Sequence, residues 1–204
     1  LLVGNAYVHV LTQISHGLAC LLTAPQLAAV VEITANLEPV CLRRLDAMVP
    51  TDAVCAARGI DPKTAVEAAT SLTRLMASGT PTQADQAIFY SMICRYDIVR
   101  ELVLVEVGER LQNFDYAFTA VDLNAFMTRF TTEYPDAARW TEATVKRIKG
   151  SLRQTLRHAG LIGEGQSPES ERLSPLFLDS DVERALVQLG EQSLIAALTG
   201  RAVM

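Results

Sequence analysis

The sequence predicts an all-α protein, and three features support this prediction. Alanine and leucine are abundant, whereas aromatic residues make up only 6% of the chain. No long stretch alternates polar and β-branched residues as a half-buried strand would. Proline repeatedly follows a capping residue where an apolar helical pattern begins. With 204 residues, 50% of them apolar, the chain can bury a sizeable core without disulfides or metals.

The first 31 residues contain no Asp, Glu, Lys or Arg, which raises the question of a membrane span. Polar residues interrupt the segment, and its cleanest apolar run, residues 17–22, is far shorter than the roughly 18 to 20 residues that a span needs. A basic region and a cleavage site typical of a signal peptide are also missing. We therefore expect a buried helix at about 7–22 in a cytoplasmic protein with no membrane partner.

Several further helices are predicted up to residue 94, because each begins at a capping residue or a proline and ends at a proline or glycine. Their expected ranges are 26–35, 40–49, 51–58, 62–77 and 81–94. Residues 96–112 follow, with Ile98, Leu102, Val105 and Gly108 on one apolar stripe. The run LVLVEV within them is also compatible with a strand, but the flanking charges recur at helical spacing and favour a helix.

Three helices are expected in the C-terminal half. Thr119 and Asp122 resemble a capping box for a helix at 120–130, Thr141 caps a helix at 141–159, and a last helix runs over about 181–198. Residues 163–170 form the loosest stretch. We expect an N-terminal helical region at 1–79 and a C-terminal one at 80–204 that contains a basic, winged-helix-like segment at 140–178.

The helix at 141–159 is basic in a chain whose formal net charge is -5. Its apolar residues recur at spacings of three and four, which predicts one buried stripe. Four cations follow a neighbouring stripe over about three turns, a spacing suited to the phosphates of a nucleic acid. Gly150 lies beside them and would let another backbone approach closely, or else serve helix packing. The candidate DNA-binding residues of this segment are Arg139, Thr144, Lys146, Arg147, Lys149, Arg153 and Arg157.

Two local patterns are typical of DNA-binding modules. The helix end LRHAGLI resembles the point where the reading helix of a winged module continues into a hairpin, and the return strand is expected at 172–177, as a small β-wing. Residues 51–77 have the layout of a helix-turn-helix, with Gly59 in the turn. Its second helix offers Lys63 and Thr64 to DNA, and an ordinary helical hairpin is the alternative.

Catalysis and metal binding find little support in the sequence. The four cysteines, Cys20, Cys41, Cys55 and Cys94, form no CxxC pair, so we expect buried free thiols. His16 and Cys20 would make only half of a metal site. Asp97 and Glu101 share a helix face, but neighbouring arginines favour surface ion pairs. No nucleotide-binding, hydrolase or zinc-protease motif is present, so we expect no enzyme, no cofactor and no metal.

The stretches AIFYSMICRYDIVRELVLVEVGERL and AVDLNAFMTRFTTEYPDAARWTEATVKRIKGSLRQTLRHAGLI resemble BrxA, the small helical component of bacteriophage exclusion (BREX) defence systems. The similarity covers about residues 61–178. It is most evident in a tail motif met by Thr144, Lys146 or Arg147, Leu156, Ala159, Gly160 and Leu161. The resemblance implies an all-helical, non-enzymatic, cytoplasmic protein that binds double-stranded DNA and acts with a methyltransferase, an ATPase and a phosphatase-like partner.

Our expectation is a protein that binds duplex DNA mainly through its backbone, with Thr144 and Arg147 as the contacts to base edges. Five cations on phosphates would give a slope of about -4.5 for log affinity against log salt. Two alternatives remain open. The basic face could dock an acidic partner protein in an assembly scaffold, or the chain could be a helical RNA-binding factor.

Overall fold

The computed structural model describes residue 45 and residues 47–163, 167 and 170–201. These residues are predominantly helical, with no named strand and two isolated antiparallel bridges among them, which confirms the all-α prediction. The described residues fall into two compact units, one made of those up to residue 95 together with 179–191, and the other of those within 96–178 together with 192–201.

The first unit contains α4 (Asp52–Arg58), α5 (Pro62–Ser78), α6 (Pro81–Arg95) and α11 (Ser180–Gln188). Both α6 and α11 pack against α5. The buried face of α5 is rich in alanine, so neighbouring helices can approach it closely; it includes Ala65, Val66, Ala68, Ala69 and Leu72. Thr51 and Asp61 cap α4 and α5. The division expected after residue 79 runs between α5 and α6, which the structure places in one unit.

A buried polar network joins α4 to the end of α11. The Arg58 guanidinium donates to the carbonyl of Leu189 and lies 2.8 Å from the Glu191 carboxylate, which also accepts a hydrogen bond from Tyr90. Glu191 is 4% exposed. The preceding residue, Gly190, has φ 69°, a conformation that favours glycine. The single helix predicted at 181–198 is therefore wrong, because the chain turns at Gly190 and continues as α12 (Gln192–Thr199) in the second unit.

Residues 97–112 of the second unit are helical throughout, as α7 (Asp97–Glu101), the π-helical segment η1 (Leu102–Val107) and α8 (Gly108–Gln112). The strand alternative for LVLVEV is thus excluded. The buried stripe is Val99, Val103, Val107 and Leu111 together with Leu102 and Gly108, whereas the expected Ile98 and Val105 are only half-buried. In an α-helix, each step of four residues rotates about 40° beyond a full turn, so residues four apart do not stay on one line. The wider π turns of η1 reduce this rotation and keep the buried stripe on one side.

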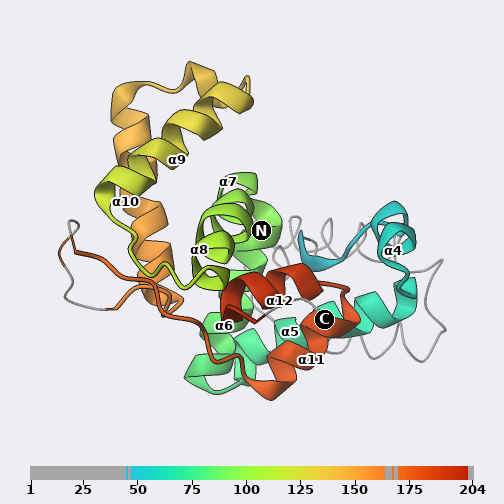
Figure 1. The fold of residues 1–204 in the computed structure, drawn as a ribbon. Helices are drawn as coiled ribbons and strands as arrows, with labels where there is room; N and C mark the ends of the chain where they lie inside the picture. Colours follow the sequence, from blue (N-terminus) through green and yellow to red (C-terminus); the bar gives the residue numbers. More distant parts are fainter. Residues whose placement is uncertain (1–44, 46, 164–166, 168–169, 202–204) are drawn as a thin grey trace, which may run out of the picture. The chain divides into compact units, whose positions relative to one another are not determined.

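Helix α12 crosses η1 and α8 at close range (Figure 1). The contact point is Gly108, where an added Cβ would lie 2.8 Å from the Cβ of Ala197. Because Gly108 has ordinary helical backbone angles, the missing side chain serves this approach.

The remaining helices of this unit are α9 (Ala120–Glu133), the 3-10 turn η2 (Ala137–Arg139) and α10 (Glu142–His158), which packs against α9 (Figure 1). The predicted capping box is confirmed: Asp122 accepts hydrogen bonds from the backbone and hydroxyl of Thr119. Asp122 also binds the Arg110 guanidinium at 2.8 Å. Partial burial acts to raise the pKa of Asp122, but the bonds from Thr119 and Arg110 outweigh it and hold the pKa below its ordinary value.

Some sequence expectations lie outside the described residues. They concern the helices at 7–22 and 26–35, the His16 and Cys20 pair, and Cys41. Of the helix expected at 40–49, only Leu45, Ala47 and Met48 are described as helical. None of the helices in the described part of the chain combines the length and the apolarity that a membrane crossing requires.

Replacing Gly108 with alanine is expected to lower the free energy of unfolding by about 1–3 kcal/mol, because the new methyl group overpacks the crossing with α12. Gly150→Ala is the matched control, since nothing lies within 4 Å of a Cβ added there, and it should raise stability by up to about 1 kcal/mol. Urea unfolding followed by circular dichroism measures both. A Gly108→Ala variant as stable as the natural chain would contradict the close crossing.

Asp122→Asn is expected to lower the free energy of unfolding by about 1–2 kcal/mol at pH 7. A folded-state pKa below the unfolded value stabilises the fold above the unfolded pKa, and this contribution is lost as the pH falls through the folded pKa. The difference in the free energy of unfolding between this variant and the natural chain should therefore become smaller as the pH falls below about 3.9. Urea unfolding between pH 7 and pH 3 tests this, with the exposed Asp85→Asn as control. A difference that stays constant over this range would contradict the assignment.

Candidate nucleic-acid interface

Helix α10 lies with one face against its unit and the opposite face in solvent. Leu152 and Leu156 are 4% and 0% exposed, and Val145 and Ile148 are half-buried on the same side. These positions recur at spacings of three and four, as the sequence predicted. Thr141 caps the helix by accepting from the backbone of Thr144. The helix is therefore a fixed support for whatever its exposed side contacts.

Short antiparallel bridges hold the end of α10. Ile162 bridges Leu173, and Ala117 bridges Arg172, so the segment around 171–174 lies between two others. Further backbone bonds join Leu173 to Tyr116 and Ser174 to Leu161. Along the chain, a helix and a bridging segment come first, then α9 and α10, and then two further bridging segments. The return expected at 172–177 does pair with the segment after α10, as isolated bridges.

The same bridging segment places a buried carboxylate beside two of the predicted DNA-binding cations. Glu171 is 1% exposed and accepts from Arg153 Nε at 2.8 Å and from an Nη of Arg157. The sequence predicted one continuous row of four free cations, and the structure differs because the two arginines of that row bind Glu171. A carboxylate that is buried from solvent requires charged hydrogen-bond donors such as these guanidiniums. The cluster still carries one net positive charge.

A third member of the row, Lys149, also has a partner within the unit. Its ammonium donates to the side-chain oxygen of Asn124 on α9 at 2.7 Å. Because the asparagine side chain is neutral, this bond positions the lysine without cancelling its charge. Lys149 is half-buried, so it can meet a phosphate only at the edge of α10.

The solvent-facing side of α10 is a different stripe from the one expected. It is narrow and polar, and after Glu142 in the first turn it has no acidic residue; the exposed residues that follow are Ala143, Lys146, Arg147, Gly150, Ser151, Gln154 and His158. The sequence analysis missed Ser151 and Gln154 as candidates. The spacing from Arg147 to Gln154, two helical turns, could have identified them.

Two predicted residues lie near the N-terminus of α10. Arg139 is exposed at the end of η2. Thr144 is half-buried, and its hydroxyl lies 3.0 Å from the hydroxyl of Thr141. Arg139 is thus an exposed cation shortly before the start of α10, whereas Thr144 takes part in the cap.

In the segment at 51–77, α4, a turn at Gly59 with φ 66° and α5 follow one another, an order that an ordinary helical hairpin shares with a helix-turn-helix. Lys63 is exposed, while the backbone and hydroxyl of Thr64 both donate to Asp61. The cap residue Asp61 and Glu67 on α5 are also exposed, and Lys63 is the one cation in the first two turns of α5. The structure brings no basic surface together here comparable to that of α10.

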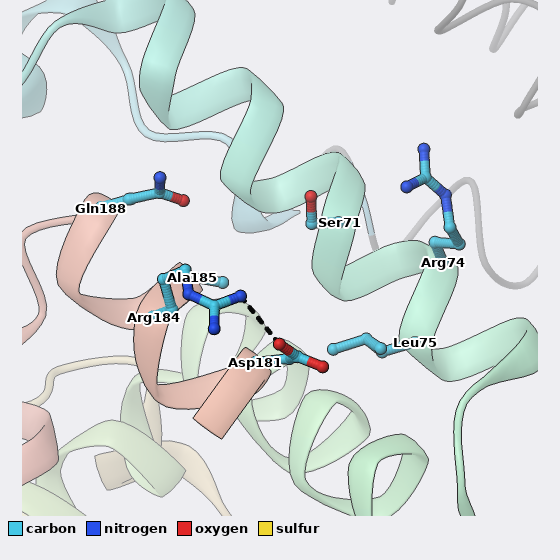
Figure 2. A pocket seen from close by; sticks show the side chains of 7 residues that line it. All are labelled: Ser71, Arg74, Leu75, Asp181, Arg184, Ala185 and Gln188. Carbon is cyan, nitrogen blue, oxygen red and sulfur yellow. Dashed lines mark hydrogen bonds and ion pairs between the residues drawn. The ribbon is translucent and has the colours of Figure 1, made fainter. Parts of the chain in front are cut away.

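The described residues offer little for catalysis. They contain no group of three or more metal-ligating side chains, and Cys55 and Cys94 are free thiols, the first buried and the second half-buried. Glu101 accepts from the hydroxyl of Tyr134 at 3.2 Å, so it is not a free partner for Asp97. A shallow pocket of about 240 Å³ between α5 and α11 is lined by Ser71, Arg74, Leu75, Asp181, Arg184, Ala185 and Gln188. Figure 2 shows Arg184 turned onto Asp181 within it.

Comparisons with known proteins agree with the resemblance seen in the sequence. The family model described as BrxA matches residues 41–190, more than half of the chain. The chain is also similar to the "BREX protein BrxA" of Escherichia coli O9:H4 (strain HS), with 21% identity over 127 residues, which are 62% of this chain and 58% of that protein. The chain thus matches less than two thirds of the length of this relative. No solved structure matches it.

Replacing Glu171 with leucine is expected to lower the free energy of unfolding by about 2–4 kcal/mol, because Arg153 and Arg157 lose their carboxylate while staying partly buried. The triple variant Arg153→Met, Arg157→Met and Glu171→Leu should recover much of this loss. Urea unfolding measures both variants, with the exposed Glu133→Gln as control. A Glu171→Leu variant no less stable than the control would show that the cluster does not hold α10.

Proposed function

The chain belongs to the BrxA family, and from this premise we propose that it is a non-enzymatic component of a BREX-type bacteriophage defence system that binds double-stranded DNA through α10. The observation that supports DNA binding is the solvent-facing side of α10. It displays Lys146 and Arg147 and no acid after the first turn, and Arg139 is exposed on η2 shortly before the helix. Cations gathered on one face of an acidic protein favour a local contact with a polyanion.

The contacts to DNA follow from which cations remain available. Arg139, Lys146 and Arg147 are exposed and Lys149 keeps its charge at the edge of the helix, so these four contact phosphates in our proposal. Arg153 and Arg157 share the Glu171 carboxylate. The single net positive charge of this cluster adds to the positive electrostatic potential around α10. Four phosphate contacts give a slope of about -3.6 for log affinity against log salt, shallower than five free cations would give.

The position of α10 suits a DNA groove. Its buried face rests on the unit, and its end is held by the bridged segments at 161–162 and 171–174. A helix supported in this way can lie in the major groove, which is wide enough to admit it. The helix-turn-helix of α4 and α5, with Lys63 and Thr64, is a second element that could meet DNA, but its surface carries fewer cations.

Other BREX components, a methyltransferase, an ATPase and a phosphatase-like protein, are the protein partners that we propose from family membership. The same basic surface of α10 could dock an acidic face of one of them. Purified protein without partners distinguishes the two roles, because only a DNA-binding protein retards duplex DNA by itself. Competition between duplex DNA and duplex RNA then shows which of the two nucleic acids the protein prefers.

The double variant Lys146→Glu and Arg147→Glu is expected to weaken binding to random duplex DNA and to make the salt slope shallower by about 1.8, because two phosphate contacts are lost. The variant Arg74→Glu and Arg95→Glu is the matched control, since both arginines are exposed in the first unit and the net charge changes equally. Fluorescence anisotropy at several salt concentrations measures both. Equal losses of affinity in the two variants would refute a contact local to α10.

A further inference from the structure

Gly150 lies in the middle of α10 without a structural reason in the described part of the chain. It is exposed, and a Cβ added there would meet nothing within 4 Å. It is not among the glycines with positive φ, so its backbone angles do not require glycine either. Glycine is a poor residue for the interior of a helix compared with alanine. Contact with a second molecule would explain it, because only a missing side chain allows another surface to reach the helix backbone.

The residues around Gly150 indicate what that second molecule is. Arg147 precedes it by nearly one turn, Ser151 follows directly, and Gln154 comes about one turn later, all three exposed. Arginine pairs bidentately with guanine and glutamine with adenine in the major groove, and serine bonds to several bases. No exposed side chain of α10 after Ala143 is apolar, whereas protein interfaces are centred on large apolar or aromatic residues. The face is suited to base edges rather than to a protein.

We propose that α10 enters the major groove at Gly150 and contacts base edges with Arg147, Ser151 and Gln154. These contacts give the protein a preference for certain DNA sequences, in addition to its contacts with the DNA backbone. This inference rests on the proposed DNA binding and goes beyond it, because phosphate contacts alone carry no sequence information. Gln154 lies 3.3 Å from the ring of His158, and this neighbour can hold its amide in one orientation.

The test begins with selection of bound duplexes from a randomised pool, which should enrich a short motif containing guanine and adenine. Gly150→Gln places a flexible side chain where the groove floor should lie. We expect at least a tenfold loss of affinity for the enriched motif, with a urea midpoint equal to or higher than that of the natural chain. Gly150→Ala, the smallest change, should lose less affinity. Thr132→Gln on α9, also exposed, is the control and should bind normally.

Two further variants assign the contacts. Arg147→Ala should remove the preference for guanine and Gln154→Ala the preference for adenine, each at one position of the motif and with helical circular dichroism unchanged. Because Arg147 also contacts phosphate in our proposal, the decisive readout is the altered motif and not the loss of affinity.

The possible outcomes separate this inference from the proposed function. If Gly150→Gln binds the DNA as tightly as Thr132→Gln, or if no motif is enriched, the proposed contacts to base edges are refuted. Loss of binding in the double variant Lys146→Glu and Arg147→Glu would in that case still support DNA binding. If the natural chain retards no duplex DNA at any salt concentration, both proposals fail.

Discussion

Glu171 lies almost out of reach of solvent between the guanidiniums of Arg153 and Arg157, and the arrangement of α10 depends on this interaction. A buried carboxylate is costly unless charged donors surround it, and here both donors come from one helix. The residue beside it, Arg172, forms a bridge to Ala117, and Leu173 bridges Ile162. The ion pairs and the bridges therefore fix the same segment against the helix. As a result, the rotation of α10 about its axis, and with it the side that faces solvent, is determined.

This rotation separates two roles within one basic helix. Arg153 and Arg157 hold the helix in place, and Lys149 is tied to α9 through Asn124. Lys146 and Arg147 remain exposed together with small and polar residues. Charge that stabilises a protein and charge that meets a ligand thus occur on adjacent stripes of the same helix, and neither composition nor spacing along the sequence distinguishes them.

Three glycines show how differently the same residue type is used. Gly190 adopts φ 69° and ends α11, so that Glu191 can turn back to Arg58. Gly108 has helical angles and lets α12 approach α8. Gly150 has neither function within the described residues. The first two are explained by the chain itself, which is the reason for attributing the third to a second molecule.

The sequence by itself determined the helical class and most helix ends, because capping residues, prolines and apolar spacing act over a few neighbouring residues. The capping box at Thr119 and Asp122 and the caps at Thr51, Asp61 and Thr141 are such local features. Only the tertiary structure decided that the π segment at 102–107 shifts the buried stripe, that the last predicted helix divides at Gly190, and that Glu171 pairs with Arg153 and Arg157. Each of these depends on residues far apart in the chain, or on a small change in helical pitch, and neither leaves a periodic signal in the sequence.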